Sequence, residues 1–465
     1  MIITPKATSY TPDPKLLDLE GRISDPVEAA HFPEARLRFR NDRWDGAVGL
    51  DQLTDAEWVG HFGRFLPLPG NLPQPLALRY HGHQFRQYNP DIGDGRGFTF
   101  AQLRDGQGRL LDLGTKGSGT TPYSRFGDGR LTLKGGMREI LATEMLEALG
   151  VETSKTFSII ETGEELQRND EPSPTRAAVM VRLSQGHIRI GTFQRLATIR
   201  DAETMHLLID YVLTNLYDET PNSTPAGQLL GLVCERTARL AASYMAAGFV
   251  HGVLNSDNIN VTGESFDYGP WRFAPTWDPS FTAAYFDTQR LYAFGRQAQA
   301  IHWDVVQLAI SLRLLAEPEE LAPPLDQWPE LYEMALRDAM FARIGIAPHD
   351  DDADLALLGT IDAALQTSKV SVDRFFFDWR GGRRRGASPA DAHYDSDAFA
   401  PFRATIAKYD GVTSTDHPYW SDANPCSMLI DEVEAIWSAI DQRDDWGPLE
   451  AKVAAIRRMG DALRG

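Results

Sequence analysis

The sequence predicts an α+β protein in which a strand-rich lobe is followed by a helical lobe, with a cleft between them. Strand-like segments punctuated by glycine surround a single clear helix in residues 76–195, whereas the chain beyond residue 200 is helical. This order is typical of α+β folds, in which ligands commonly bind between the two parts. The sequence therefore divides into an irregular extension packed on the core (1–75), a strand-rich lobe (76–195), a helical lobe (196–320) and a helical carboxy-terminal region (321–465).

Three strands and one helix define the strand-rich lobe. Residues 110–116, 155–160 and 177–183 are short runs rich in apolar and β-branched side chains, which indicates strands. Between the first and second runs, apolar residues recur at helical spacing from Met137 to Ala148. Gly150 is a suitable stop for this helix.

Longer apolar stripes define the helical lobe. One stripe covers residues 207–216, and a longer helix is expected over 229–247, where Gly248 would end it. Residues 304–316 are strongly apolar, which predicts a buried helix. The chain beyond residue 317 continues this mainly helical pattern.

Composition and charge exclude several classes of function. The chain of 465 residues has a formal net charge of −19, whereas a nucleic-acid-binding surface needs clustered lysine and arginine. No apolar run reaches the ~18 residues of a membrane-spanning helix, and residues 1–6 lack the basic and apolar stretches of an export signal. Cys234 and Cys426 predict reduced thiols, with one regulatory disulfide as the alternative. We therefore expect a cytoplasmic monomer that binds neither nucleic acid nor membrane.

The stretch from His251 to Asn258, with the sequence His-Gly-Val-Leu-Asn-Ser-Asp-Asn, resembles the catalytic loop of the kinase fold. In small-molecule kinases, His-Gly-Asp is followed after four residues by Asn, and Asn258 is in that register. The position of the usual catalytic aspartate holds Val253, which cannot accept a proton, and an aspartate stands instead at Asp257. This pattern predicts a bilobal protein-kinase-like fold that binds nucleotide and metal but carries out a different reaction on the nucleotide than a kinase does.

Two oxygen-bearing residues are candidates for holding a metal. Asn258 and Asp267 are of the types that bind Mg²⁺ between phosphate oxygens, and Mn²⁺ accepts the same ligands. Asp267-Tyr268-Gly269 is similar to the Asp-Phe-Gly turn of kinases. Asp257 is the candidate base, because removing a proton from an attacking hydroxyl needs a carboxylate near the metal. The alternative is that Asp257 only orients Asn258 or a water molecule.

A lysine and a glutamate upstream form a second candidate pair. Lys116 is expected at the end of a strand and Glu139 in the first turn of the following helix. In this arrangement a carboxylate holds an ammonium group against nucleotide phosphates. A surface ion pair is the alternative. Arg182 and Arg189 follow a later strand and could reach the same polyphosphate.

Glycine-rich segments offer further phosphate contacts. Gly93-Asp94-Gly95-Arg96-Gly97 and Gly127-Asp128-Gly129-Arg130 combine close backbone approach with a guanidinium group. Taken alone, each segment is also consistent with an ordinary hairpin turn.

These residues, in this order, resemble the selenoprotein O family of protein adenylyltransferases. The resemblance runs from about Tyr80 to Leu312 and includes the glycine-rich segments, Lys116 to Arg125, Arg138-Glu139 and the His251 loop. It implies a kinase-like fold that binds ATP in an inverted orientation. It also implies transfer of AMP to Ser, Thr or Tyr hydroxyls of proteins, with release of pyrophosphate.

The resemblance also implies a role for each matching residue. Asp257 would accept the proton, Asn258 and Asp267 would hold Mg²⁺, and Glu139 would pair with Lys116. The residues expected to contact the nucleotide are Gly93, Gly95, Arg96, Lys116, Asp128, Gly129, Arg182, Arg189 and Asp267.

The chain departs from the family pattern in two places. Its last residues contain neither the selenocysteine nor the cysteine that members usually carry there, which puts redox control in doubt. Residues 86–89 also diverge, and this difference could alter which proteins dock. A kinase-type phosphotransferase and a non-catalytic ATP-binding scaffold are the alternatives. Val253 argues against the first, and the retained Lys116, Glu139, Asn258 and Asp267 argue against the second.

Overall fold

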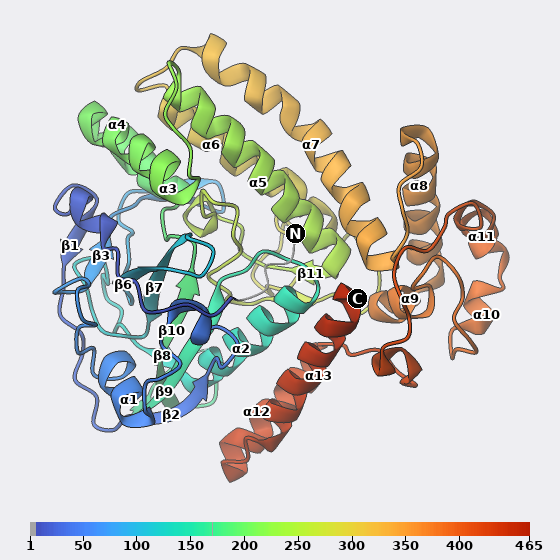
Figure 1. Ribbon diagram of the computed structural model, residues 1–465, viewed down its shortest axis with the longest axis horizontal. Helices are drawn as coiled ribbons and strands as arrows, with labels where there is room; N and C mark the ends of the chain where they lie inside the picture. The colour runs from blue at the N-terminus through green and yellow to red at the C-terminus, as the bar shows by residue number, and fades with distance from the viewer. Residues whose placement is uncertain (1–5, 170) are drawn as a thin grey trace.

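The computed structural model describes residues 6–169 and 171–465, and its two parts match the predicted α+β class (Figure 1). An antiparallel sheet dominates the amino-terminal part, and helices make up the carboxy-terminal part. The predicted fold class is therefore confirmed. Residues 1–5, which carry most of the segment examined for an export signal, lie outside the described residues. The four domain boundaries stay a prediction.

The main sheet has the strand order β1-β3-β6-β7-β10-β9-β2, with β8 paired to β10. The strands are β1 (Ser24–Pro26), β2 (Arg36–Arg40), β3 (Leu76–Leu78), β6 (Thr99–Arg104), β7 (Leu110–Lys116), β8 (Leu131–Thr132), β9 (Lys155–Leu166) and β10 (Thr175–Ser184). All three strands predicted from short apolar runs are present. They lie next to one another as β7, β10 and β9, and β7 is buried throughout.

Residues 1–75, which we expected to be irregular, contribute β1, β2 and helix α1 (Asp55–Phe62) within their described part. A capping box begins α1, because the Thr54 hydroxyl accepts from the Glu57 amide and the Glu57 carboxylate accepts from the Thr54 amide. Trp58 of α1 then packs against Phe157 of β9. This segment therefore covers one face of the sheet.

Helix α2 (Leu133–Ala148) covers the other face and confirms the predicted helix. Gly136 allows it to approach the sheet, since a Cβ there would lie 3.1 Å from Ile159 Cδ1. The last helix of the chain, α13 (Gly447–Arg464), lies against α2 (Figure 1), where Arg457 pairs with the buried Glu144. The carboxy-terminal region is thereby fastened to the strand-rich part.

The helical part is built around α5 (Pro225–Ala247), α6 (Gln297–Leu312) and α7 (Pro318–Ile344), which run side by side (Figure 1). Gly248, at φ +68°, ends α5 as predicted. The other helices are α3 (Ile190–Ile199), α4 (Ala202–Tyr211), α8 (Asp351–Ser368), α9 (Val372–Asp378), α10 (Asp391–Tyr394), α11 (Ala400–Ile406) and α12 (Ile430–Arg443). Two hairpins complete the fold: β4 (Gly82–Gln84) with β5 (Gln87–Asn89), and β11 (Phe249–Val250) with β12 (Arg272–Phe273).

Two predictions from composition concern membranes and cysteines. Across the described ranges, every helix is too short or too polar to cross a bilayer. Cys234 is a buried free thiol in α5, and Cys426 is a half-buried free thiol before α12.

Candidate active site

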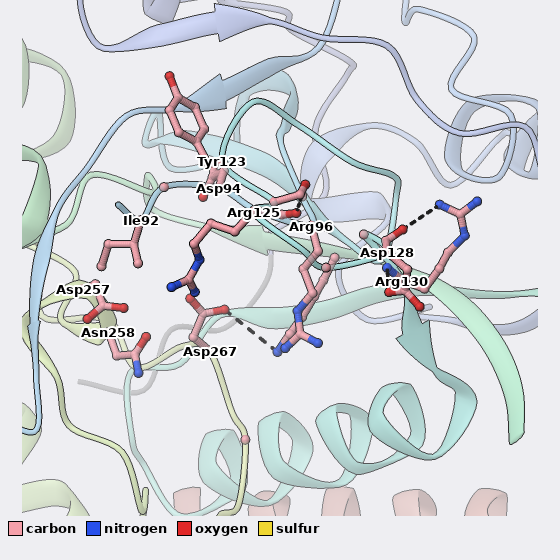
Figure 2. Close-up of a pocket in the computed structure, with 18 of the residues that line it drawn as sticks. Ile92, Asp94, Arg96, Tyr123, Arg125, Asp128, Arg130, Asp257, Asn258 and Asp267 are labelled. Atoms are coloured by element: carbon pink, nitrogen blue, oxygen red, sulfur yellow. Dashed lines mark hydrogen bonds and ion pairs between the residues drawn. The ribbon is translucent and has the colours of Figure 1, made fainter. Parts of the chain in front are cut away.

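One pocket of about 780 Å³ brings the predicted site residues together from both parts of the chain (Figure 2). In Figure 2, Asp257 and Asn258 lie at one end of the pocket, and Asp128 and Arg130 lie at the other. The predicted residues that line it are Gly93, Gly95, Arg96, Lys116, Asp128, Gly129, Arg182, Arg189, Asp257, Asn258 and Asp267. Glu139 stands directly behind this lining.

Lys116 and Glu139 form a buried ion pair at the back of the pocket. Lys116 is the last residue of β7, and its Nζ donates to the Glu139 carboxylate. Only 8% of the lysine side chain and 3% of the glutamate side chain are exposed, so this is not a surface ion pair. Burial lowers the pKa of Lys116, and the charge of Glu139 opposes that shift. Glu139 lies in the second turn of α2, where we had expected the first.

Asp267 lies among three cations. Its Oδ1 accepts from Arg182 Nη1 at 2.6 Å and lies 4.0 Å from Lys116 Nζ, and its Oδ2 accepts from Arg189 Nη1 at 2.5 Å. Burial alone would raise the pKa of Asp267, but the three cations hold it well below its usual range. Asp267 also adopts a left-handed backbone, at φ +59°, which turns its carboxylate into this cluster.

A chain of buried polar side chains orients Arg182. Its Nε donates to His187 Nε2 at 3.2 Å, and His187 Nδ1 faces Asp112 Oδ2 at 3.2 Å. The histidine must therefore be neutral, with its proton on Nδ1. Burial lowers the pKa of His187, which favours the same state. Gln102 extends the chain by donating to Asp112 at 2.6 Å. Arg182 thus approaches the pocket in one fixed orientation.

The two glycine-rich segments both pack against residues 119–124 beside the pocket. A Cβ on Gly93 would lie 2.5 Å from the Tyr123 ring, and Gly129, at φ +70°, meets the backbone of Gly119. Arg96 lines the pocket and forms no ion pair with any residue in the described part of the chain. Asp128 lies at the rim, where it pairs with Arg168 at 2.8 Å.

Asp257 is the one pocket carboxylate with an unused buried oxygen, among the residues that the structure describes. It lies in the turn Ser256–Asn258, where its Oδ2 accepts from Gln84 Nε2 at 3.4 Å and its buried Oδ1 has no hydrogen-bond partner. Burial raises the pKa of Asp257 to about 6, although Arg189 opposes the shift. A carboxylate with such a pKa is suited to accept a proton near neutral pH.

Asn258 and Asp267 supply a donor set that fits a hard cation. Asn258 Nδ2 donates to the Val253 carbonyl at 3.0 Å, so its amide oxygen is the atom left for a ligand. One amide oxygen and one carboxylate are what Mg²⁺ commonly takes from a protein when phosphates complete its coordination. The described residues contain no larger group of His, Cys, Asp and Glu that could hold a metal by itself.

Asp94 and Gln84 also belong to the pocket lining, although neither is among the predicted site residues. Asp94 lies 3.4 Å from Arg189, and its Oδ2 accepts from the Leu78 amide at 3.0 Å. Gln84 contacts Asp257 from the β4–β5 hairpin. Asp94 lies inside a motif that we had noted for its glycines. The contact of Gln84 with Asp257 joins residues 173 positions apart, so spacing along the sequence does not predict it.

The arrangement defines a class of site. Arginine and lysine side chains from the sheet face oxygen ligands from the helical part across one pocket, as binding of a nucleotide polyphosphate requires. A family model described as "Protein adenylyltransferase SelO" matches residues 7–457. The chain belongs to this family of protein adenylyltransferases.

Similar proteins extend over nearly the whole chain. A "Protein nucleotidyltransferase YdiU" from Synechococcus elongatus is 41% identical over 97% of this chain and 95% of that protein. One of the same name from Gloeobacter violaceus is 41% identical over 96% and 95%. Among solved structures, a rhoptry antigen kinase domain from Toxoplasma gondii has 11% identity and covers 58% of this chain and 84% of that one. The TM-score of this pair is 0.28.

Proposed function

We propose that this protein transfers AMP from ATP to a Ser, Thr or Tyr hydroxyl of another protein and releases pyrophosphate. One observation carries the proposal. Val253 stands where a kinase has its base, while Asp257, with an unpaired oxygen and a pKa near 6, lines the pocket that holds the arginines. Family membership supports the same reaction.

The chemical step follows from these positions. Asp257 takes the proton of the acceptor hydroxyl, and the hydroxyl oxygen attacks the α-phosphorus. The bond between the α-phosphorus and the oxygen that bridges to the β-phosphate breaks, and pyrophosphate leaves with that electron pair. Arg182, Arg189 and Lys116 are suited to hold the β- and γ-phosphates, because their charges are buried and fixed in place.

A divalent cation fits beside this step. Mg²⁺ held by Asn258 and Asp267 would neutralise phosphate charge when bound, and Mn²⁺ accepts the same ligands. Asp267 would then exchange its arginine partners for the metal as the phosphates engage those arginines. We also propose that the protein acts as a monomer in the cytoplasm, where its two thiols would stay reduced.

Labelled ATP tests the proposal directly. With a generic protein acceptor, ATP labelled at the α-phosphate should transfer label and add one AMP to the intact mass, and Asp257→Asn should abolish both. Asp338→Asn, on the exposed surface of α7, is the matched control and should transfer normally. Label from γ-labelled ATP alone would support a kinase-type phosphotransferase. Stabilisation by ATP without any transfer would support a scaffold.

A further inference from the structure

An exposed aromatic cluster lies directly beside the catalytic loop. Its members are Phe85, Tyr285 and Phe286, which are 38%, 87% and 45% exposed. The ring centroids of Phe85 and Phe286 are 6.0 Å apart, and those of Tyr285 and Phe286 are 5.2 Å apart. Large aromatic side chains that gather on a surface mark interaction sites more often than single exposed ones do.

The tip of the β4–β5 hairpin presents Phe85 to this cluster. Gln84 pairs with Gln87, so Phe85 and Arg86 form a two-residue turn, at φ +50° and +64°. Asparagine and glycine are the residues that such turns favour. A phenylalanine and an arginine in this left-handed backbone conformation raise the free energy of the folded state, and residues with such strained backbones are concentrated at functional sites.

The hairpin is fastened to the catalytic loop by hydrogen bonds. The Phe85 amide donates to Asn255 Oδ1 at 3.0 Å, and the His83 amide donates to Ser256 Oγ at 2.7 Å. Tyr292 Oη donates to the same Asn255 oxygen at 2.7 Å, and its ring centroid lies 5.1 Å from that of Phe85. The cluster is therefore continuous with the loop that carries the proposed base.

The segment that carries Tyr285 and Phe286 is held rigidly. The buried Asp287 carboxylate accepts from the Leu291 and Tyr292 amides, each at 2.8 Å. Ala283, just before the two aromatic residues, lies against Gly252 of the catalytic loop, where an added Cβ would come within 3.0 Å. The exposed rings are thus presented by an ordered turn, which lowers the entropy cost of binding a partner.

Positive charge flanks the aromatic cluster in an acidic chain. Arg86 and Arg290 are exposed, and neither has an ion-pair partner within residues 6–169 and 171–465. The Arg86 guanidinium lies over the Trp303 ring, 5.4 Å from its centroid, and this contact orients the side chain beside the hairpin. Acidic side chains on a partner would complement these two cations.

We infer that Phe85, Tyr285 and Phe286 dock the protein substrate through a segment that carries a large apolar side chain and acidic residues near the acceptor hydroxyl. The inference rests on the proposed function, because a protein acceptor must bring its hydroxyl to Asp257. The aromatic cluster would select the apolar side chain, and Arg86 and Arg290 would favour the acidic ones.

Direct binding of fluorescent dodecapeptides tests the inference separately from catalysis. Each peptide has a central Ser, with Phe or Ser at one flanking position and Glu or Gln at the others. The wild-type protein should bind Phe/Glu peptides at least tenfold more tightly than peptides in which Ser replaces Phe. Tyr285→Ser combined with Phe286→Ser should remove this preference, and Arg86→Gln should reduce the gain from Glu. The control is the double variant Met334→Ser with Leu355→Ser, which changes two exposed apolar residues on α7 and α8. It should keep both the preference for Phe and the gain from Glu.

Several outcomes would overturn the inference. Equal binding of the Phe and Ser peptides, or loss of the preference in the control, would exclude this docking surface. If the wild-type protein is a dimer and the Tyr285 and Phe286 substitutions dissociate it, the cluster is an interface with a second copy of the chain and not a substrate-docking surface. Failure of AMP transfer with the peptide preference intact would refute the proposed function alone. Transfer to proteins without any peptide preference would refute the docking surface alone.

Discussion

The raised pKa of Asp257 suits this carboxylate to accept a proton, but burying its charged form also lowers the stability of the folded protein. Its pKa rises from the ordinary 3.8 to about 6 because it is buried, so folding disfavours its charged form. Between these two values the folded state binds more protons than the unfolded state. Stability therefore falls as the pH rises from about 4 to about 6, and the cost is complete above that window.

The size of this cost follows from the two pKa values. At 1.36 kcal/mol per unit of pKa difference, the full cost is about 3 kcal/mol above pH 7. Nearly half of it, about 1 kcal/mol, develops between pH 5 and pH 8. Asp257→Asn has no charge to bury, so its stability relative to the wild type should increase by about 1 kcal/mol over this interval. Any fixed cost of burying the asparagine amide cancels in the comparison.

Urea unfolding of the nucleotide-free protein at pH 5, 6, 7 and 8 measures the change. Asp422→Asn is the control, because Asp422 is only half-buried and its pKa is lowered through its hydrogen bond to Arg458. Its effect should stay constant over the same range. A stability difference for Asp257→Asn that does not vary between pH 5 and pH 8 would refute the raised pKa.

The same pKa predicts the pH dependence of catalysis. Wild-type transfer should increase about tenfold per pH unit below pH 6 and level off above it, because only the ionised carboxylate accepts a proton. Asp257→Asn should lower the plateau rate above pH 7 by about 10²-fold or more, and the gap to the wild type should narrow as the pH falls below 6. A wild-type rate that is unchanged from pH 5 to pH 8 would show that another group accepts the proton.

Three further predictions concern buried ion pairs. Lys116→Met should destabilise the protein by about 3–5 kcal/mol, because it leaves Glu139 buried and unpaired; adding Glu139→Gln should restore thermal stability but not AMP transfer. Asp267→Ala should abolish transfer and lower the unfolding temperature of the nucleotide-free protein, because the arginines beside Asp267 lose their partner. Tripolyphosphate can take the place of that partner, so it should raise the unfolding temperature of this variant more than that of the wild type. Arg457→Ala should cost about 3 kcal/mol in urea unfolding through the loss of its bidentate pair with buried Glu144, without changing the KM for ATP.

Helices with regular apolar spacing were predictable from the sequence, and short elements were not. The helix ending at Gly248 has a clear stripe and a left-handed glycine stop, both of which can be read locally. By contrast, β1 and β2 are only three and five residues long and show no usable alternation. The start of α2 was placed too late because Gly135 and Gly136, poor helix formers, occupy its first turn. Thr132 nevertheless begins the helix by accepting from the Gly135 amide, and Glu139 therefore falls in the second turn.

The candidate site was predictable as a set of residues but not as a balance of charges. Motif spacing brought forward Lys116, Asp257 and Asp267, which now line one pocket. Spacing carries no information on burial, and burial decides whether a lysine is a surface cation or a fixed phosphate ligand. The neutral His187 that orients Arg182 depends on a contact with Asp112, 75 positions away in the sequence.

Internal neutralisation explains how the pocket can hold three buried cations. Arg182 and Arg189 share the Asp267 carboxylate, and Lys116 pairs with Glu139. Each of these three buried cations therefore has an anionic partner. In the proposed reaction, a nucleotide polyphosphate would replace Asp267 as the partner of the arginines, and the carboxylate would then be available to a metal. Glu139 is not released in this exchange, because it lies behind the pocket and stays with its lysine. The two carboxylates therefore have different consequences when removed: loss of Glu139 should affect folding first, whereas loss of Asp267 should affect transfer even where phosphate restores the fold.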